Sequence, residues 1–215
     1  MIRVSNVTKT YHTPTGTNVV LDNVSFTLER GQSIGVMGRN GAGKSTLTRL
    51  ISGLEKPDSG TVERHMTVSW PLGYFGAFQS SLTGADNARF VARIYGRDIQ
   101  TTLDSVEEFA SLGKYFNMPL STYSAGMRAR LALGVSLAVE FDCYLIDEIT
   151  GAGDHRFAER SHKALADRRA NGTLLMISHD VASLKNYCET GALLDRGKLT
   201  FYDTLDELAE AYYAI

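Results

Sequence analysis

The stretch Gly38-Arg39-Asn40-Gly41-Ala42-Gly43-Lys44-Ser45-Thr46 decides how this chain folds, because it fits the phosphate-binding pattern G-x-x-x-x-G-K-[ST] at every required position. It follows the apolar run 33–37, which predicts a buried strand, and precedes Leu47, Leu50 and Ile51, whose spacing predicts an amphipathic helix. A glycine-rich turn that binds nothing is the alternative interpretation. The order of strand, loop and helix favours a site for a nucleoside triphosphate.

Each residue type in this loop has a physical task in such a site. The glycines let backbone N–H groups curl around an anion, and the N-terminus of the helix adds partial positive charge. Lys44 is expected to reach the β- and γ-phosphates, Ser45 to hold Mg²⁺ through its hydroxyl, and Thr46 to bond a nearer phosphate. The residues expected to bind the nucleotide here are Gly38, Asn40, Gly41, Ala42, Gly43, Lys44, Ser45 and Thr46.

The composition is that of an ordinary globular protein. The 215 residues are 43% hydrophobic and 21% charged, which suffices for one domain with a core and room for a subdomain. Lys and Arg total 22 against 24 Asp and Glu, so the formal net charge of −2 predicts no nucleic-acid partner. The longest apolar run, 131–139, is far shorter than the ~18 residues of a membrane-spanning helix. We therefore expect a cytosolic chain, in which Cys143 and Cys188 are reduced thiols that pack.

The first 32 residues predict short strands joined by turns. Residues 19–21 and 24–28 alternate between apolar and polar positions, as half-buried strands do. Asp22 and Asn23 lie between these runs and predict a turn. The pattern indicates an N-terminal antiparallel β-subdomain.

From about residue 82 to 137 the pattern becomes helical, with apolar positions such as Phe90 and Ile94 at helical spacing. Two apolar runs follow, at 144–146 and 174–177, with helical sequence between them. This arrangement is typical of a parallel βαβ core. The fold class expected is α/β, with a phosphate-loop core into which a helical subdomain is inserted.

A second chemical element is the run Phe141-Asp142-Cys143-Tyr144-Leu145-Ile146-Asp147-Glu148, an apolar strand that ends in two adjacent carboxylates. Ligands of open α/β folds bind at the carboxyl edge of the sheet. This strand would place its two carboxylates at that edge. Asp147 is then expected to hold Mg²⁺, and Glu148 to polarise the attacking water as general base. Strand ends are often acidic without any such role, so this interpretation depends on the phosphate loop upstream.

The segment Tyr123-Ser124-Ala125-Gly126-Met127-Arg128 resembles the signature, usually written LSGGQ, of the ATP-binding subunits of ABC transporters. Ser124 and Gly126 match that signature. The departures from it are Tyr123, Ala125 and Met127. An ordinary serine N-cap before a helix over 130–139 is the alternative interpretation. The resemblance covers nearly the whole chain, and it implies that Ser124 and Gly126 contact the γ-phosphate bound by a second subunit.

The remaining elements of that family occur in the expected order. Gln79 matches the glutamine that senses Mg²⁺ and water, Asp154 stands where the D-loop crosses to the partner subunit, and His179 matches the switch histidine that hydrogen-bonds the γ-phosphate. Tyr11 resembles the aromatic residue that stacks on adenine, a role for which the ring alone suffices. Taken singly, His179 could be a polar residue at a strand end and Tyr11 an ordinary strand aromatic. The resemblance implies catalytic roles for Glu148, His179 and Gln79, and metal-binding roles for Ser45, Gln79 and Asp147.

Several segments resemble the polysaccharide-export branch of ABC transporters, above all the ATP-binding subunits of Gram-negative group 2 capsule exporters. These segments are Ser69–Gly73, Phe78–Gly84, Asn87–Tyr95, Leu112–Phe116, Ser124–Arg128 and Ile146–Thr150. The resemblance implies a homodimeric ATPase at the cytoplasmic face of the inner membrane that uses ATP and Mg²⁺ to power export of lipid-linked capsular polysaccharide. It also implies a separate membrane permease and periplasmic and outer-membrane export partners. The whole chain, 1–215, would be one nucleotide-binding domain.

Three alternatives remain at this point. The cargo could be an O-antigen-like or teichoic-acid-like polymer, because those exporters share several of the same segments. A non-transport ABC ATPase of translation or DNA repair would share every nucleotide-site residue. A stand-alone phosphate-loop kinase or GTPase would explain Lys44 and Asp147, but it gives no reason for Ser124, Gly126 and His179 in that order.

Overall fold

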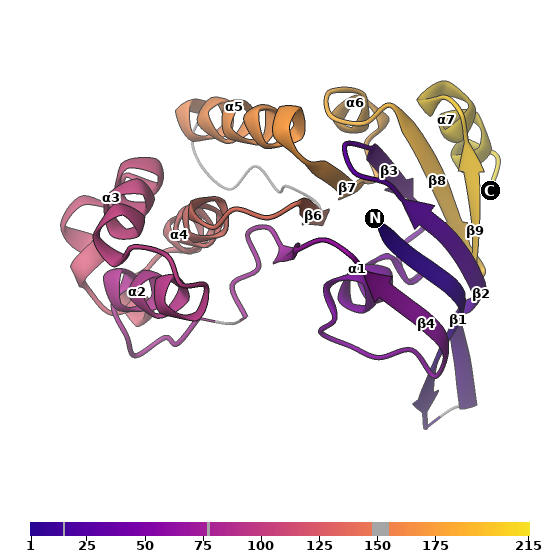
Figure 1. Cartoon of the computed structure of the whole chain (residues 1–215), viewed down its shortest axis with the longest axis horizontal. Coiled ribbons are helices and arrows are strands. Elements are labelled where there is room, and N and C mark those ends of the chain that lie inside the picture. The colour runs from indigo at the N-terminus through magenta and orange to yellow at the C-terminus, as the bar shows by residue number, and fades with distance from the viewer. Residues whose placement is uncertain (15, 77, 148–154) are drawn as a thin grey trace. The chain divides into compact units, whose positions relative to one another are not determined.

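The computed structural model describes residues 1–14, 16–76, 78–147 and 155–215 (Figure 1). The chain forms two compact units. The first holds Met1–Pro71, the segment that begins at Phe141, and Arg168–Ile215, and the second holds Leu72–Glu140 and the part of helix α5 up to Asp167. The phosphate loop therefore belongs to the first unit, and the helical segment to the second.

Two sheets make up the first unit. Its elements are β1 (Ile2–Thr13), β2 (Gly16–Leu28), β3 (Ser33–Met37), α1 (Lys44–Ser52), β4 (Ser59–Arg64), β5 (Val68–Pro71), β6 (Cys143–Asp147), β7 (Thr173–Ile177), α6 (Val181–Lys185), β8 (Thr190–Asp195), β9 (Lys198–Tyr202) and α7 (Leu205–Tyr213), with α5 (His155–Asn171) shared between the units. The first sheet is antiparallel, in the order β2-β1-β4. The second has the order β5-β6-β7-β3-β8-β9, with five parallel strands and β9 antiparallel to β8. The expected α/β class with an N-terminal antiparallel sheet is confirmed.

The turn predicted at Asp22 and Asn23 is wrong, because β2 runs through both residues. Asn23 has a φ of 54°, and Asn6 in the neighbouring strand β1 has a φ of 50°. Asn6 Nδ2 donates to Asn23 Oδ1 over 2.9 Å, and the pairing register of the two strands shifts in this region. Asparagine tolerates the left-handed conformation, so residues that signal a turn here form a bulge-like irregularity within a long hairpin.

Strand β3 lies at the centre of the second sheet, as its apolar sequence predicted. All five of its residues are buried, and it pairs in parallel with β7 on one side and β8 on the other. Strand β6 pairs in parallel with β7, so the two apolar runs 144–146 and 174–177 lie side by side. The carboxyl ends of β3, β7 and β6 therefore meet at one edge of the sheet.

Helix α1 packs its apolar face into a core that both sheets share. Leu47, Leu50 and Ile51 are 0–1% exposed, and the same core includes Leu21 of the first sheet and Leu175 of the second. Burial of a large apolar side chain contributes about 1.5–3 kcal/mol. This packing fixes the N-terminus of α1 against the edge of the sheet.

The second unit is helical, as the periodicity predicted. Its elements are α2 (Gly84–Ile94), α3 (Ile99–Ala110), the 3₁₀ turns η1 (Gly113–Asn117) and η2 (Leu120–Thr122), and α4 (Ala125–Ala138) (Figure 1). Phe90 and Ile94, which indicated the helix, are 60% and 59% exposed, whereas α2 buries small residues such as Ala88. Helix α4 begins at Ala125 and not at 130, because Ser124 caps it. Within the described ranges, no helix combines the length and the apolar content that crossing a membrane requires.

Both cysteines are buried free thiols, as predicted. Burial raises the pKa of Cys143 and of Cys188 to about 12. Both thiols are therefore protonated at neutral pH and serve as small packing groups.

Asp142 anchors the start of β6 to two other segments of the first unit. Its carboxylate accepts hydrogen bonds from Arg30 Nη1 at 2.6 Å and from the backbone N–H of Thr67 at 2.8 Å. The bond from Arg30, followed by that from Thr67, lowers the pKa of Asp142 to about 2. A carboxylate with a lowered pKa stabilises the folded state above its unfolded pKa near 4, and this contribution is lost as the pH falls from about 4 to about 2.

We therefore predict that Asp142→Asn lowers the free energy of unfolding by about 1 kcal/mol at pH 7, a modest value because the ion pair is partly exposed. The difference from wild type should shrink below about pH 4. Urea unfolding at about pH 7, 4 and 2.5 measures it, with Asp203→Asn at an exposed position as control. A loss that stays constant across this range would contradict the assignment.

Candidate nucleotide site

The phosphate loop leaves β3 through a backbone that requires glycine at two points. A Cβ at Gly38 would lie 2.4 Å from the carbonyl oxygen of Leu194, and one at Gly43 would lie 2.4 Å from Cγ1 of Val20. Gly43 also has a φ of 106°, a conformation that other residues rarely adopt. The loop is thus pressed against β8 and β2, and glycine is needed for that packing independently of any ligand.

Lys44 lies across this loop at the first position of α1. Its Nζ donates to the carbonyl oxygens of Gly38 at 2.6 Å and of Arg39 at 3.1 Å. The N-cap of α1 is Gly43. The structure describes every residue of the first turn of this helix, and none of them is acidic. The ammonium group and the helix N-terminus therefore both favour an anion at this end of α1.

A pocket of about 420 Å³ opens beside the loop. Its lining residues are Val20, Asn40, Gly41, Gly43, Lys44, Ser45, Thr46 and Asp147. The structure thus brings Asp147 together with six of the predicted loop residues. Gly38 and Ala42 belong to the loop but not to this lining, and Ala42 packs against the core. The volume falls in the range of small-molecule sites.

His179 stands at the same edge of the sheet as the loop and Asp147. Ile177, the last residue of β7, pairs with Asp147 of β6, and exposed His179 follows it by two residues. Strand β7 lies between β6 and β3 in the sheet. The segment with His179 therefore leaves the sheet between the segments that follow β6 and β3. Asp180 accepts hydrogen bonds from the N–H groups of Ala182 and Ser183 at 3.2 and 2.9 Å, which fixes the turn after His179.

The oxygen donors of the pocket fit Mg²⁺. Ser45 and Asp147 bring a hydroxyl and a carboxylate to one lining. In the part of the chain that the structure describes, no group of three or more His, Cys, Asp or Glu could hold a metal ion by itself. Mg²⁺ in nucleotide sites takes one or two protein oxygens and completes its shell with phosphates and water, which this donor set allows. Glu148 and Asp154 lie outside the described residues.

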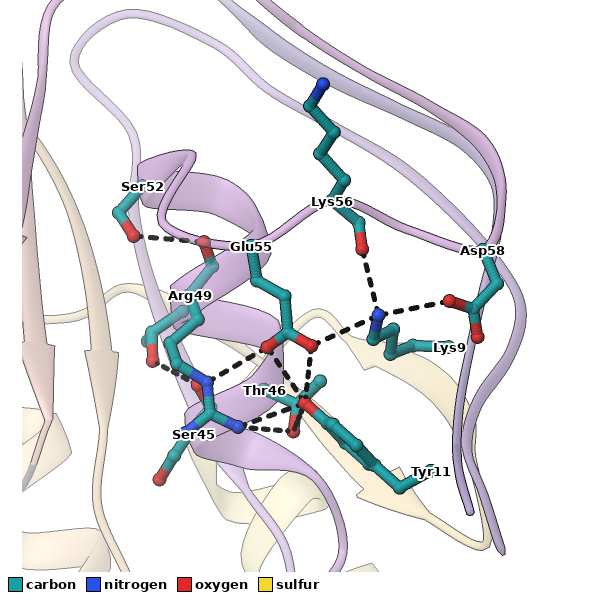
Figure 2. A network of polar contacts seen from close by, with 10 residues as sticks. Lys9, Tyr11, Ser45, Thr46, Arg49, Ser52, Glu55, Lys56 and Asp58 are labelled. Atoms are coloured by element: carbon teal, nitrogen blue, oxygen red, sulfur yellow. Dashed lines mark hydrogen bonds and ion pairs between the residues drawn. The ribbon is translucent and has the colours of Figure 1, made fainter. Parts of the chain in front are cut away.

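Tyr11 of β1 is held by a polar network that sequence reasoning missed (Figure 2). Its Oη lies 2.8 Å from both carboxylate oxygens of Glu55 and 3.4 Å from Oγ1 of Thr46. Arg49 donates to Tyr11 Oη and to the Glu55 carboxylate, each over 3.1 Å. Nothing in the sequence pattern signals this network, because its members come from a strand, a helix and the segment after the helix.

Gln79 lies in the second unit, where Asn87 of α2 holds its main chain. Its N–H donates to Asn87 Oδ1 at 2.9 Å, and Asn87 Nδ2 donates to the carbonyl oxygens of Gln79 at 3.2 Å and Thr83 at 2.8 Å. Asn87 is 4% exposed, whereas Gln79 is exposed. Sequence reasoning missed Asn87 as the support of Gln79. The signal available in the sequence was an amide side chain, that of Asn87, among the small residues that α2 buries.

Ser124 and Gly126 begin helix α4 of the second unit. Ser124 Oγ accepts from the N–H of Met127 at 3.2 Å, so its interpretation as an N-cap is confirmed. The hydroxyl proton remains available to donate, so the cap does not oppose a phosphate contact. A Cβ at Gly126 would meet nothing nearer than Ser124 Oγ at 4.0 Å. The packing of this chain therefore does not itself require glycine at 126.

Comparisons with known proteins agree with this geometry. A family model described as "ABC transporter" matches residues 21–151. The chain is 49% identical to the ATP-binding protein BexA of Haemophilus influenzae over 99% of this chain and 98% of that protein. It is 47% identical to the capsule polysaccharide export ATP-binding protein CtrD of Neisseria meningitidis over the full length of both. A dimeric post-hydrolysis structure of the ATP-binding cassette MJ0796 with ADP and Pi superposes with a TM-score of 0.82 at 22% identity, over 95% of this chain and 99% of that one, which shows the fold.

The loop geometry predicts different costs for two glycine substitutions. Gly41 and Gly43 both have positive φ, but a Cβ at Gly41 would meet nothing within 4 Å. Gly41→Ala should cost about 1–2 kcal/mol of stability for the left-handed backbone. Gly43→Ala should cost about 1–3 kcal/mol more, because Val20 must move. Urea unfolding without nucleotide measures both, and equal losses would contradict the packing described.

Proposed function

Because the chain belongs to the ABC transporter family, we propose that it is the ATP-hydrolysing subunit of an exporter of lipid-linked capsular polysaccharide. The observation that supports capsular polysaccharide as the cargo is the full-length similarity, at 47% identity, to an ATP-binding protein of capsule polysaccharide export. The pocket beside the phosphate loop supports the ATPase activity. An O-antigen-like or teichoic-acid-like cargo would use the same nucleotide site and is the alternative.

In this proposal the first unit binds the phosphates of ATP. The backbone of the loop and Lys44 hold the β- and γ-phosphates, while Ser45 and Asp147 hold Mg²⁺ in the shared pocket. The metal ion, when bound, neutralises charge on the phosphate oxygens. Glu148 accepts a proton from the attacking water, and His179 donates a hydrogen bond to the γ-phosphate. Gln79 contributes from the second unit by sensing the metal and the water.

Tyr11 provides the base end of the site in the same proposal. It lies on β1, and Thr46 of the phosphate loop is its neighbour over 3.4 Å. A ring at this place can stack on adenine while the phosphates bind at the N-terminus of α1. Stacking on a base is worth about 1–3 kcal/mol and is tolerant of the base.

We propose further that two copies of the chain share each ATP. Ser124 and Gly126 of one copy would contact the γ-phosphate held by the loop of the other, and Asp154 would cross to the partner. The open space around Gly126 supports this, because the chain's own packing leaves room for a group from outside. The first turn of α4 also offers backbone N–H groups to an anion.

The proposed partners complete the exporter. A separate permease would span the membrane, and the ATPase dimer would sit on its cytoplasmic face at the inner membrane. Periplasmic and outer-membrane export proteins would receive the polysaccharide. Closure of the dimer on ATP and its reopening after hydrolysis would supply the mechanical step.

Replacing the gene in its organism of origin with variants tests the export function. Lys44→Ala and Glu148→Gln should both abolish surface polysaccharide, while lipid-linked polymer accumulates inside the cell. Purified Glu148→Gln should still bind ATP, with turnover reduced at least about 100-fold. Lys56→Ala, at an exposed lysine whose side chain points away from the network in Figure 2, is the matched control. Normal surface polysaccharide in Lys44→Ala would refute the proposal, and loss of an O-antigen or teichoic-acid polymer instead would favour the alternative cargo.

Mixing two inactive variants tests the shared site. Lys44→Ala damages the loop of its own subunit, whereas Gly126→Asp places a negative charge against the phosphate held by the partner. Aspartate in the first turn favours the helix, so Gly126→Asp should keep the fold, which thermal unfolding verifies. About half of the randomly exchanged dimers are mixed and keep one intact site, so activity should return to about a quarter of wild type. Full inactivity of the mixture, with specific activity of the wild type unchanged on dilution to monomer, would exclude a two-subunit site.

A further inference from the structure

The network around Tyr11 joins three segments of the first unit through one carboxylate (Figure 2). Strand β1 contributes Lys9 and Tyr11, helix α1 contributes Thr46 and Arg49, and the segment after α1 contributes Glu55. Glu55 accepts from Tyr11 Oη at 2.8 Å, from Arg49 Nε at 3.1 Å, and pairs with Lys9 Nζ at 3.1 Å. Glu55 is therefore the common acceptor of the network.

The donors and acceptors of this network can be assigned from the number of protons that each group can donate. A phenol has one proton, and Tyr11 gives it to Glu55, which is acceptor-only when ionised. Arg49 Nη2 can only donate, so it must give the hydrogen bond to Tyr11 Oη over 3.1 Å. In the 3.4 Å contact, Thr46 Oγ1 must be the donor to Tyr11. The phenolic oxygen is thus held from three directions.

Hydrogen bonds and neighbouring cations keep Glu55 in the ionised form against the effect of burial. Its side chain is 23% exposed and that of Lys9 13%. Burial alone would raise the pKa of Glu55, but the hydrogen bonds from Tyr11 and Lys9 outweigh it, and the net pKa is lowered. The hydrogen bond that Lys9 donates to Asp58, followed by that to Glu55, raises the pKa of Lys9, so this cation stays charged beside Glu55.

We propose that Glu55 is a positioning residue of the nucleotide site, which holds the hydroxyl of Tyr11 so that its ring is set for stacking on the base. The inference rests on the proposed function, in which Tyr11 stacks on adenine. A ring already held in place loses less freedom when the base binds, so the hydroxyl improves affinity without touching the nucleotide. Thr46 of the phosphate loop donates to the same hydroxyl, so the base end and the phosphate end of the site share one network.

This role differs from plain anchoring of the segment after α1, and the chain offers a matched control. Asp58 also pairs with Lys9, at 3.0 Å, and it accepts from the N–H of Thr10 at 2.7 Å, but it does not contact Tyr11. Asp58→Asn therefore weakens the same anchor and leaves the bond between Tyr11 and Glu55. Glu55→Gln keeps the size of the side chain but removes its charge.

Calorimetric titration of the full chain with MgATP and with magnesium tripolyphosphate, which has no base, tests the proposal. Glu55→Gln and Tyr11→Phe should each weaken MgATP by about 3- to 10-fold, the range for one hydrogen bond, and leave tripolyphosphate within about twofold of wild type. The double variant should be no weaker than Tyr11→Phe, because both changes act on the same contact: Glu55→Gln takes the charge from its acceptor and Tyr11→Phe removes it. Asp58→Asn should bind both ligands within about twofold of wild type, and thermal unfolding verifies that each variant is folded.

The outcomes separate this inference from the proposed function. If Tyr11→Ala binds MgATP like wild type, the stacking role fails and the inference fails with it. If Tyr11→Ala weakens MgATP but Glu55→Gln and Tyr11→Phe do not, stacking stands and only the positioning role is overturned. Equal weakening of MgATP and tripolyphosphate by Glu55→Gln, or the same loss in Asp58→Asn, would also overturn it, because the effect would then be general anchoring.

Discussion

The parallel pairing of β6, β7 and β3 is the constraint on which the first unit depends. Ile177 of β7 pairs with Val36 on one side and with Asp147 on the other, so the three strands end at one level. The phosphate loop, His179 and Asp147 therefore emerge at one edge of the sheet. A slip of the register by one residue would turn the Asp147 side chain to the other face, because side chains along a strand alternate.

Helix α1 makes a binding site of that edge, because its N-terminus, its buried face and the face toward β1 have different roles. Its N-terminus carries Lys44 and favours anions, while Leu47 and Leu50 are buried in the core shared by both sheets. Thr46 and Arg49 contact Tyr11 of β1. Burial of one side thus holds the phosphate end and the base end at a fixed separation, which a flexible loop alone could not do.

The residues with proposed roles are divided between the two compact units. Lys44 and Asp147 belong to the first, whereas Gln79 and Ser124 belong to the second. The second unit prepares its own groups locally, since Asn87 holds the main chain of Gln79 and the cap at Ser124 starts α4. The proposed function therefore uses groups from both units, each of which is positioned by contacts within its own unit.

The sequence by itself determined the phosphate loop, the buried strands and the helical segment, because each rests on local spacing and on glycine or apolar patterns within a few residues. It did not determine that Asp22 and Asn23 continue a strand, since a bulge depends on the partner strand. It also did not determine that α2 exposes Phe90, because periodicity marks a face without saying what covers it. The contact between Glu55 and Tyr11 joins residues 44 positions apart, and only the tertiary structure, by packing α1 beside β1, decided it.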